Sequence, residues 1–271
     1  VYECKAKGIF RNRKIKPLPG DDVKVTVLDE AAMTGNIEDI MDRRSELIRP
    51  AVANADQAVI VFAMSWPDPN FNLLDRFLVL LHRQQMETVI CFNKKDQIEE
   101  RVRKEFLRIY EKSGCRVLMV SAKKGDGIGE LAALLKGRVT VLAGPSGVGK
   151  STILNALYPK ANMQTGNISE KIRRGKHTTR HSELFYVGDG TYLFDTPGFS
   201  SLYLDEMEKE ELKDCYAEFE DYAGECRYLS CLHDKEPSCA VKNAVLEGKI
   251  SRERYENYVL LFHELKNRKR Y

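Results

Sequence analysis

This sequence lacks the features that mark membrane-spanning, secreted and repetitive proteins. No stretch approaches the roughly 18 consecutive apolar residues that a membrane-spanning helix needs, and no secretory signal opens the chain. There is no internal repeat and no low-complexity linker. Because Val1 is not a methionine, we expect the native N-terminus to be trimmed or missing. The composition therefore favours a cytoplasmic globular protein without a membrane partner.

An excess of charge of one sign is also missing. The chain has 43 basic and 40 acidic residues, a net charge of +3, so overall charge predicts no partner and local clusters matter more. Its seven cysteines are an odd number, and four of them are scattered singly. This usage fits a reducing compartment, where close Cys/His groups bind metal more often than they form disulfides.

The length of 271 residues is enough for two or three domains, and three zones differ in pattern. Residues 1–52 alternate like short strands and predict a small β-barrel that lacks its first strand or two. Residues 53–204 alternate apolar strands with helices, which predicts a largely parallel α/β sheet. Residues 205–271 are acidic and helical, then rich in Cys and His, then helical and basic.

A phosphate-binding loop is predicted where an apolar strand, 139–144, meets the helical pattern "TILNALY". The stretch "GPSGVGKS" matches G-x-x-x-x-G-K-[ST] from Gly144 to Ser151. Its glycines let backbone N–H groups surround phosphate oxygens, and the helix directs its positive end at the same anion. Lys150 is expected to reach the β- and γ-phosphates and Ser151 to ligate Mg²⁺. The alternative is a glycine-rich turn without a ligand.

Two downstream stretches fit the remaining parts of a nucleotide switch. "DTPG" ends the strand 191–195, so Asp195 is expected to hold Mg²⁺ and the N–H of Gly198 to meet the γ-phosphate. Without the upstream loop, this stretch would be an ordinary turn. In "HTTR", Thr179, with Thr178 as the fallback, is expected to ligate Mg²⁺ and sense the γ-phosphate. His177 is either the residue that positions water or a solvated loop histidine.

A guanine reader is predicted at "NKKD", residues 93–96, after the strand 88–92. The Asp96 carboxylate can accept two hydrogen bonds from guanine, which adenine does not offer. Asn93 is expected at the N7 and O6 side, and the stem of Lys94 over the face of the base. One strand later comes "SAKKG", where the Ala122 N–H can donate to O6.

The base reader precedes the phosphate loop by about fifty residues, the reverse of the usual order in guanine-nucleotide switches. The order is explained by two changes to the usual chain. The helix at about 127–136, which is usually C-terminal, is joined through Gly137 to the strand 139–144, which is usually the first, and the chain is opened after "DTPG". The sheet and its site survive such a circular permutation. Whatever follows residue 203 is then tied to the loop that senses γ-phosphate, so the last domain is expected to move or to change its contacts with nucleotide state.

A zinc site is predicted in the last zone. Cys226, Cys231, His233 and Cys239 form C-x4-C-x-H-x5-C, and three thiolates with one imidazole suit tetrahedral, structural Zn²⁺. The alternative is a few buried thiols and a surface histidine. Cys215 is not expected to be a ligand.

Two basic runs, 5–16 around Phe10 and 266–270, are candidates for RNA contact through phosphates and shape. Either run can instead be a solvated face.

In its motifs "NKKD", "SAKKG", "GPSGVGKST", "GKHTTRH", "DTPGFSS" and "CRYLSCLHDKEPSCAVK", essentially the whole chain resembles the ribosome small-subunit-dependent GTPase A family. The resemblance implies an incomplete N-terminal OB-type barrel, a circularly permuted P-loop GTPase domain and a C-terminal helical zinc-binding domain. It also implies GTP hydrolysis stimulated by the small ribosomal subunit and a role in late subunit assembly. Phe199 stands where many GTPases have a water-orienting Gln, and the resemblance makes His177 the substitute.

The resulting hypothesis is a monomeric, cytoplasmic GTPase with Zn²⁺ and Mg²⁺ as cofactors, and GTP, GDP, the small ribosomal subunit and its rRNA as partners. The residues expected to act in catalysis are His177, Lys150 and Thr179. The residues expected to bind GTP are Asn93, Lys94, Lys95, Asp96, Ser121, Ala122, Lys123, Gly144, Pro145, Ser146, Gly147, Val148, Gly149, Lys150, Ser151, Thr152, Asp195 and Gly198. The Mg²⁺ ligands are expected to be Ser151, Thr179 and Asp195.

Two other functions remain open. The chain could be an rRNA-binding assembly module that uses GTP as a structural ligand without significant turnover, a possibility that Phe199 permits. It could also be an ATP-using phosphotransferase, although Asp96 argues against adenine.

Overall fold

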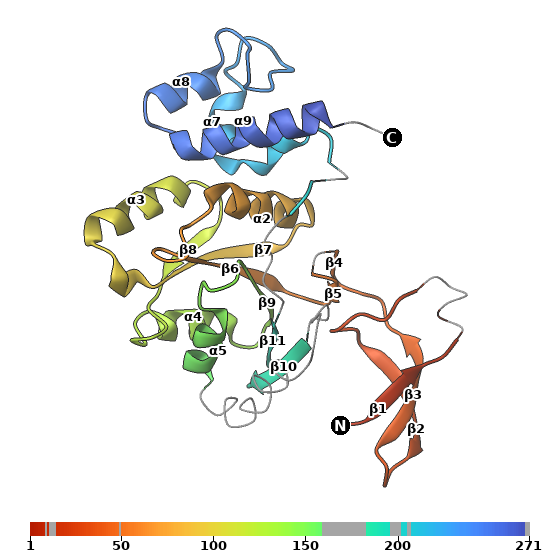
Figure 1. The fold of residues 1–271 in the computed structure, drawn as a ribbon. Coiled ribbons are helices and arrows are strands. Elements are labelled where there is room, and N and C mark those ends of the chain that lie inside the picture. Colours follow the sequence, from red (N-terminus) through yellow and green to blue (C-terminus); the bar gives the residue numbers. More distant parts are fainter. Residues whose placement is uncertain are drawn as a thin grey trace.

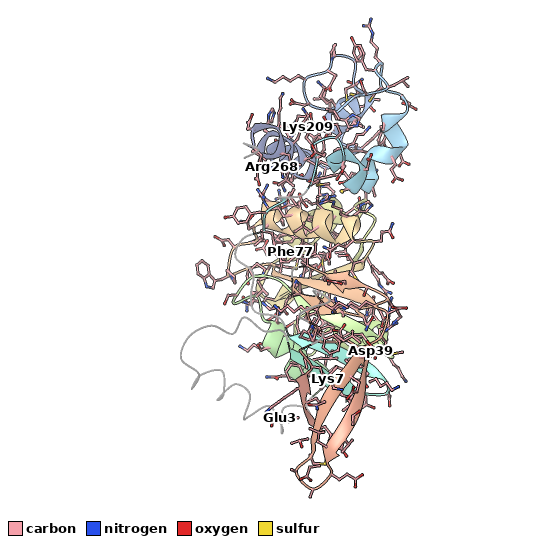
Figure 2. The ribbon with its side chains drawn as sticks, turned by 90° about the vertical axis from the view of Figure 1, so that its right-hand side faces the viewer. Glu3, Lys7, Asp39, Phe77, Lys209 and Arg268 are labelled. Carbon is pink, nitrogen blue, oxygen red and sulfur yellow. The ribbon has the colours of Figure 1, made fainter. Side chains whose placement is uncertain are left out.

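The computed structural model describes residues 1–8, 10, 15–48, 50–158, 183–195, 202–204 and 207–268. A small β sheet near the N-terminus, a central α/β layer and a C-terminal helical layer follow one another in space (Figure 1). In Figure 2, Phe77 of the central layer lies between Arg268 of the C-terminal layer and Asp39 of the N-terminal sheet. Among the described residues, no helix has the length and apolar character to cross a membrane.

The N-terminal sheet has three strands in the order β1–β3–β2: β1 (Glu3–Ala6), β2 (Val23–Asp29) and β3 (Thr34–Ile40). β1 and β2 both pair with β3, and within the described residues this sheet does not close on itself. All of β2 is solvent-exposed. β3 is not predicted from the sequence, because "TGNIEDI" lacks apolar alternation and forms a strand through pairing on both sides. A short hairpin of β4 (Glu46–Leu47) and β5 (Val52–Ala53) leads into the next layer.

The central sheet has six strands in the order β10–β11–β9–β6–β7–β8. Their bounds are β6 (Gln57–Ala63), β7 (Glu87–Asn93), β8 (Arg116–Met119), β9 (Val139–Ala143), β10 (Glu183–Gly188) and β11 (Thr191–Asp195). All neighbouring pairs are parallel except β10 with β11, and β10, an edge strand, is the one that the sequence analysis does not predict.

Helices cover both faces of this sheet (Figure 1): α2 (Phe71–Arg83) and α3 (Glu100–Tyr110) on one face, α4 (Ile128–Leu135) and α5 (Lys150–Leu157) on the other. The central strand β6 is buried throughout, and its residues alternate between the two cores. Ile60 and Phe62 join the core under α2, whereas Val59 and Val61 join the core under α4. This two-sided burial explains why β6 reads as a continuous apolar run.

The chain enters this sheet at β6, and α4 returns through Gly137 to β9. Gly137 has φ +72° and donates its N–H to Thr191 Oγ1 at 2.8 Å, so the join is held against β11. The topology agrees with the predicted architecture: an N-terminal β domain, a central α/β sheet in which β7 precedes β9 along the chain, and a C-terminal helical part with a Cys/His cluster.

The C-terminal layer consists of short helices and one long one. Their bounds are η2 (Leu212–Cys215), η3 (Ala217–Phe219), α7 (Glu220–Ala223), α8 (Ala240–Leu246) and α9 (Arg252–Asn267). Ser251 caps α9 by accepting a hydrogen bond from the Arg254 N–H at its Oγ. α9 packs against α2 and α3, which places the C-terminal layer directly on one face of the central layer (Figure 1).

Helix α2 belongs to two hydrophobic cores at once. Leu74 and Phe77 join the core of the central sheet, and Val79 joins the core of the C-terminal layer. Arg254 of α9 crosses the same boundary: it donates to Asp75 at 2.5 Å and to Glu218 at 2.7 Å, and all three side chains are almost completely buried. The two layers are therefore joined by apolar packing and by a buried ionic cluster.

Candidate functional site

The predicted nucleotide loops meet at the carboxyl edge of the central sheet. Asn93 ends β7 and residues 94–96 follow it, 121–125 come after β8 and 144–152 after β9, and Asp195 ends β11. Because these strands are parallel, their carboxyl ends lie at one edge, where α/β proteins bind ligands.

Asn93 holds three strand-end loops together. Its buried side chain donates from Nδ2 to the Val148 carbonyl at 3.0 Å and accepts the Ala122 N–H at Oδ1, at 3.1 Å. This differs from the arrangement expected from sequence, in which the Asn93 amide and the Ala122 N–H both face guanine. In the structure they bond to each other, so Asn93 acts as a brace between the loops.

Asp96 is prepared to act as an acceptor. The buried Ser121 donates its Oγ–H to Asp96 Oδ1 at 2.6 Å, and this hydrogen bond lowers the pKa of the carboxyl. Asp96 lies in η1 (Lys95–Gln97) and remains accessible to a ligand. A charged carboxylate at this point fits the two adjacent N–H donors of guanine.

Lys94 joins the predicted base reader to the predicted phosphate loop and to the loop that contains Trp66. It adopts a left-handed conformation with φ +67°, and its Nζ donates to the Gly147 carbonyl at 2.9 Å and to the Trp66 carbonyl. The Trp66 side chain is 74% exposed beside these loops. Lys95 pairs with Asp126 at 2.9 Å.

The phosphate loop requires glycine at two positions where the backbone is crowded. Gly144 has φ +141°, and a Cβ there would lie 2.2 Å from the Val61 carbonyl oxygen. Gly149 has φ +99°, and a Cβ there would lie 2.4 Å from Asn93 Nδ2. Both conformations and both contacts exclude larger residues. The loop is therefore shaped by β6 and by the Asn93 brace.

Lys150 opens α5 and lies across the loop, donating from Nζ to the carbonyls of Gly144 at 2.7 Å and Pro145 at 2.8 Å. Ser151 is exposed on the first turn of the same helix. The last residue of β11, Asp195, is in register with Leu142 of β9, two residues before Gly144. The backbone thus brings the predicted Mg²⁺ ligands Ser151 and Asp195 to the same end of two paired strands.

Several predicted residues lie outside the described part of the chain. These are His177, Thr178, Thr179, Gly198 and Phe199. Their assigned roles stay predictions.

The cysteine cluster assembles as the spacing predicts. The ligand atoms of Cys226, Cys231, His233 and Cys239 all lie within 4.8 Å of one another. The Sγ atoms of Cys226 and Cys239 are 3.8 Å apart, and His233 Nδ1 lies 3.7 Å from the first and 3.4 Å from the second. Tetrahedral zinc with its usual bond lengths separates two sulfurs by about 3.8 Å and sulfur from nitrogen by about 3.6 Å. The four residues fit one zinc ion.

The buried surroundings of this cluster determine which of its side chains a metal would have to deprotonate. Burial raises the pKa of the Cys239 thiol to about 12 and raises that of Cys231, so without a cation these thiols stay protonated. Burial lowers the pKa of His233, which keeps its ring neutral, the form that binds metal. Tyr255 donates its hydroxyl to the His233 carbonyl at 2.7 Å and holds the turn in place. Cys215, predicted not to be a ligand, is not part of the cluster.

The basic runs are partly used inside the protein. Phe10 is buried, so it is not available for stacking on a base, and residues 11–14 lie outside the described part. In the second run, Arg268 donates to the carbonyls of Leu204 at 2.9 Å and Met207 at 3.2 Å. Arg268 therefore has a structural role, and this run offers fewer basic side chains to RNA than its sequence suggests.

No sequence motif predicts the residues that join α2 to the C-terminal layer: Asp75, Arg76, Glu218, Arg254 and Glu264. The one available signal is the Asp75–Arg76 pair inside an otherwise apolar helical stretch, since charged residues are rarely fully buried unless paired. The partner residues lie more than a hundred positions away and have no local signature.

Comparison with known proteins gives consistent matches along the chain. A family model described as RsgA GTPase matches residues 40–205, and one described as RsgA N-terminal domain matches residues 1–34. A protein of Agathobacter rectalis named small ribosomal subunit biogenesis GTPase RsgA is 56% identical over 271 residues, which cover 100% of this chain and 90% of that protein. A protein of the same name from Alkaliphilus metalliredigens is 48% identical, with 100% and 93% covered.

Two solved structures are also similar. YjeQ from Thermotoga maritima is 39% identical with a TM-score of 0.81, and the match covers 98% of this chain and 90% of that one. YloQ, described as a circularly permuted GTPase, is 37% identical with a TM-score of 0.77, and the match covers 100% and 88%.

Proposed function

Because this chain belongs to the RsgA GTPase family, we propose that it hydrolyses GTP to GDP and phosphate and acts in the biogenesis of the small ribosomal subunit. The observation that carries the proposal is the Asp96 carboxylate, held by Ser121 at the sheet edge that also carries the phosphate loop. Adenine has no pair of donors for this carboxylate, which argues against an ATP-using phosphotransferase.

The chain's own residues divide the work on the nucleotide. Asp96 accepts from the base, and the Asn93 brace keeps its loop in register with the phosphate loop. Lys150 exchanges the carbonyls of Gly144 and Pro145 for phosphate oxygens when a nucleotide binds. Ser151, together with Asp195 and Thr179, would hold Mg²⁺, which supplies charge neutralisation at the β- and γ-phosphates when bound.

Water activation is assigned to His177, since Phe199 cannot hydrogen-bond to water. A side chain that positions or deprotonates water typically contributes about 10²–10⁴-fold to the rate. We expect turnover by the free protein to be slow and the small ribosomal subunit to complete the site. The zinc cluster keeps the C-terminal layer folded. The N-terminal and C-terminal parts are expected to bind rRNA, and the protein is expected to be monomeric and cytoplasmic.

The test is GTP turnover by the pure protein with and without small ribosomal subunits, with ATP as the control nucleotide. The expected result is slow release of phosphate from GTP, strong stimulation by the subunit, and no turnover of ATP. Tight binding of GTP without turnover under either condition would contradict the proposal and favour an rRNA-binding module that uses GTP as a structural ligand.

A further inference from the structure

Residues 202–204 connect the loop predicted to sense the γ-phosphate with the C-terminal layer. Leu202 is 2% exposed and belongs to the core of the central sheet, whereas Leu204 is 3% exposed and belongs to the C-terminal core. Tyr203, between them, is 58% exposed. This short segment is therefore fixed in two cores at once, directly after "DTPGFSS" in the sequence.

Arg76 of α2 holds this segment from the GTPase side. Its Nη1 donates to the Leu202 carbonyl at 3.1 Å and to Glu264 Oε1 at 2.8 Å, and its Nη2 donates to Glu264 Oε2. Its Nε donates to Asn72 Oδ1 at 2.9 Å, which fixes the plane of the guanidinium. One side chain thus joins α2, the end of the sensing loop and α9. Such planar, several-point contacts are specific to arginine.

A second guanidinium acts from the other side of the boundary. Arg268, just beyond α9, donates to the carbonyls of Leu204 and Met207. The segment is held by two cations on main-chain oxygens as well as by its buried leucines. From this arrangement we propose that Arg76 is a positioning residue for the GTPase reaction: it anchors the end of the γ-phosphate-sensing loop to a rigid unit made of α2 and α9.

The consequence for nucleotide binding follows from the chain length. Gly198 is four residues before Leu202, so the chain can separate them by at most about 14 Å. Because Leu202 is held in place, bringing the preceding residues to a γ-phosphate costs less conformational entropy than it would from an unanchored chain end. GDP has no γ-phosphate and gains nothing from this anchor. The inference rests on the proposed function, because it assumes that this loop contacts GTP.

The experiment compares Arg76→Ala with Arg83→Ala in the whole chain. Arg83 is on the same helix and also faces the C-terminal part, where it pairs with Glu211 at 3.6 Å. Dissociation constants are measured for a non-hydrolysable GTP analogue and for GDP. We expect Arg76→Ala to bind the analogue about tenfold more weakly with unchanged affinity for GDP, the effect of losing one charge-assisted contact. Arg83→Ala is expected to match the wild type for both.

A second variant keeps the inference testable if Arg76→Ala fails to fold. Arg268→Ala removes the other cation that holds the segment 202–204, and it is expected to lower the affinity for the GTP analogue, but not for GDP, in the same way. Equal losses of affinity for the analogue and for GDP, or no loss for either, would overturn this inference and leave the proposed function standing. A wild-type protein that binds neither nucleotide would overturn the proposed function and this inference with it.

Discussion

Replacing Arg254 by methionine tests whether the buried ionic cluster holds the two layers together. Arg254 donates to Glu218 at 2.7 and 3.1 Å and to Asp75 at 2.5 Å, and Asn257 donates to the other Asp75 oxygen at 2.7 Å. The Arg254 guanidinium also lies over the Tyr216 ring, 4.4 Å from the centroid. Methionine fills much of the same volume but leaves two buried carboxylates without a cation.

The expected cost follows from burial. The side chains of Arg254, Asp75 and Glu218 are 1%, 0% and 3% exposed, so solvent does not screen their charges. Removing one partner of a buried ion pair typically lowers the free energy of unfolding by about 3–5 kcal/mol. An exposed pair contributes about 0–1 kcal/mol. The two estimates are far enough apart to be distinguished.

The assay is urea unfolding followed by far-UV circular dichroism, with midpoints converted to free energies at a common m-value. Arg108→Ala is the matched control, because Arg108 joins α3 to Glu253 of α9 at 3.1 Å, across the same boundary, with both side chains exposed. We expect Arg254→Met to lower the free energy of unfolding by about 3–5 kcal/mol and the control to lower it by less than about 1 kcal/mol. Similar losses in both variants would show that burial of the cluster does not determine its strength.

The same variant has a predictable pH dependence. Burial raises the pKa of Asp75 above the usual value of an aspartate, opposed by the charge of Arg254 and by its hydrogen bond. Without Arg254, this pKa rises further, so the folded variant binds a proton that the unfolded chain releases near pH 4. Its stability then falls as the pH rises above that value. The deficit relative to wild type is expected to be smaller at pH 5 than at pH 7, and a deficit that grows on acidification would contradict the reasoning.

Three further predictions concern the nucleotide and metal sites. Asp96→Asn should lower the affinity for GTP by about tenfold or more, since it removes a charged acceptor, without changing thermal stability. Calorimetric titration measures the affinity, and the control Asp68→Asn, in the neighbouring loop, should bind GTP as the wild type does. Cys239→Ser should lower the zinc content below one ion per chain and destabilise the C-terminal layer, whereas Cys215→Ser should retain the metal, as measured by elemental analysis and thermal unfolding. His177→Ala should reduce subunit-stimulated turnover by about 10²-fold or more with unchanged affinity for GTP; phosphate release and nucleotide binding, measured on the same preparation, separate the two effects.

Local sequence patterns were enough to predict the chemistry available at the sheet edge. Apolar runs located β6, β7, β8, β9 and β11, and in a parallel sheet the residues that follow such strands must meet at one edge. The predicted guanine reader and the predicted phosphate loop could therefore be placed together in spite of their reversed order. The Cys/His spacing likewise predicted a cluster that the structure assembles, because all four residues lie within one short segment.

The roles of individual side chains follow from the packing of the layers, which the sequence patterns do not show. Asn93 braces three loops, Phe10 is buried, and Arg268 is used on main-chain carbonyls, although each has a type that suits ligand binding. The junction between α2 and α9 depends on residues 179 positions apart, as in the contact of Asp75 with Arg254. Local patterns record which residues are polar and where a strand ends. They do not record which distant partner satisfies a buried charge, because only the packing of the layers brings the two together.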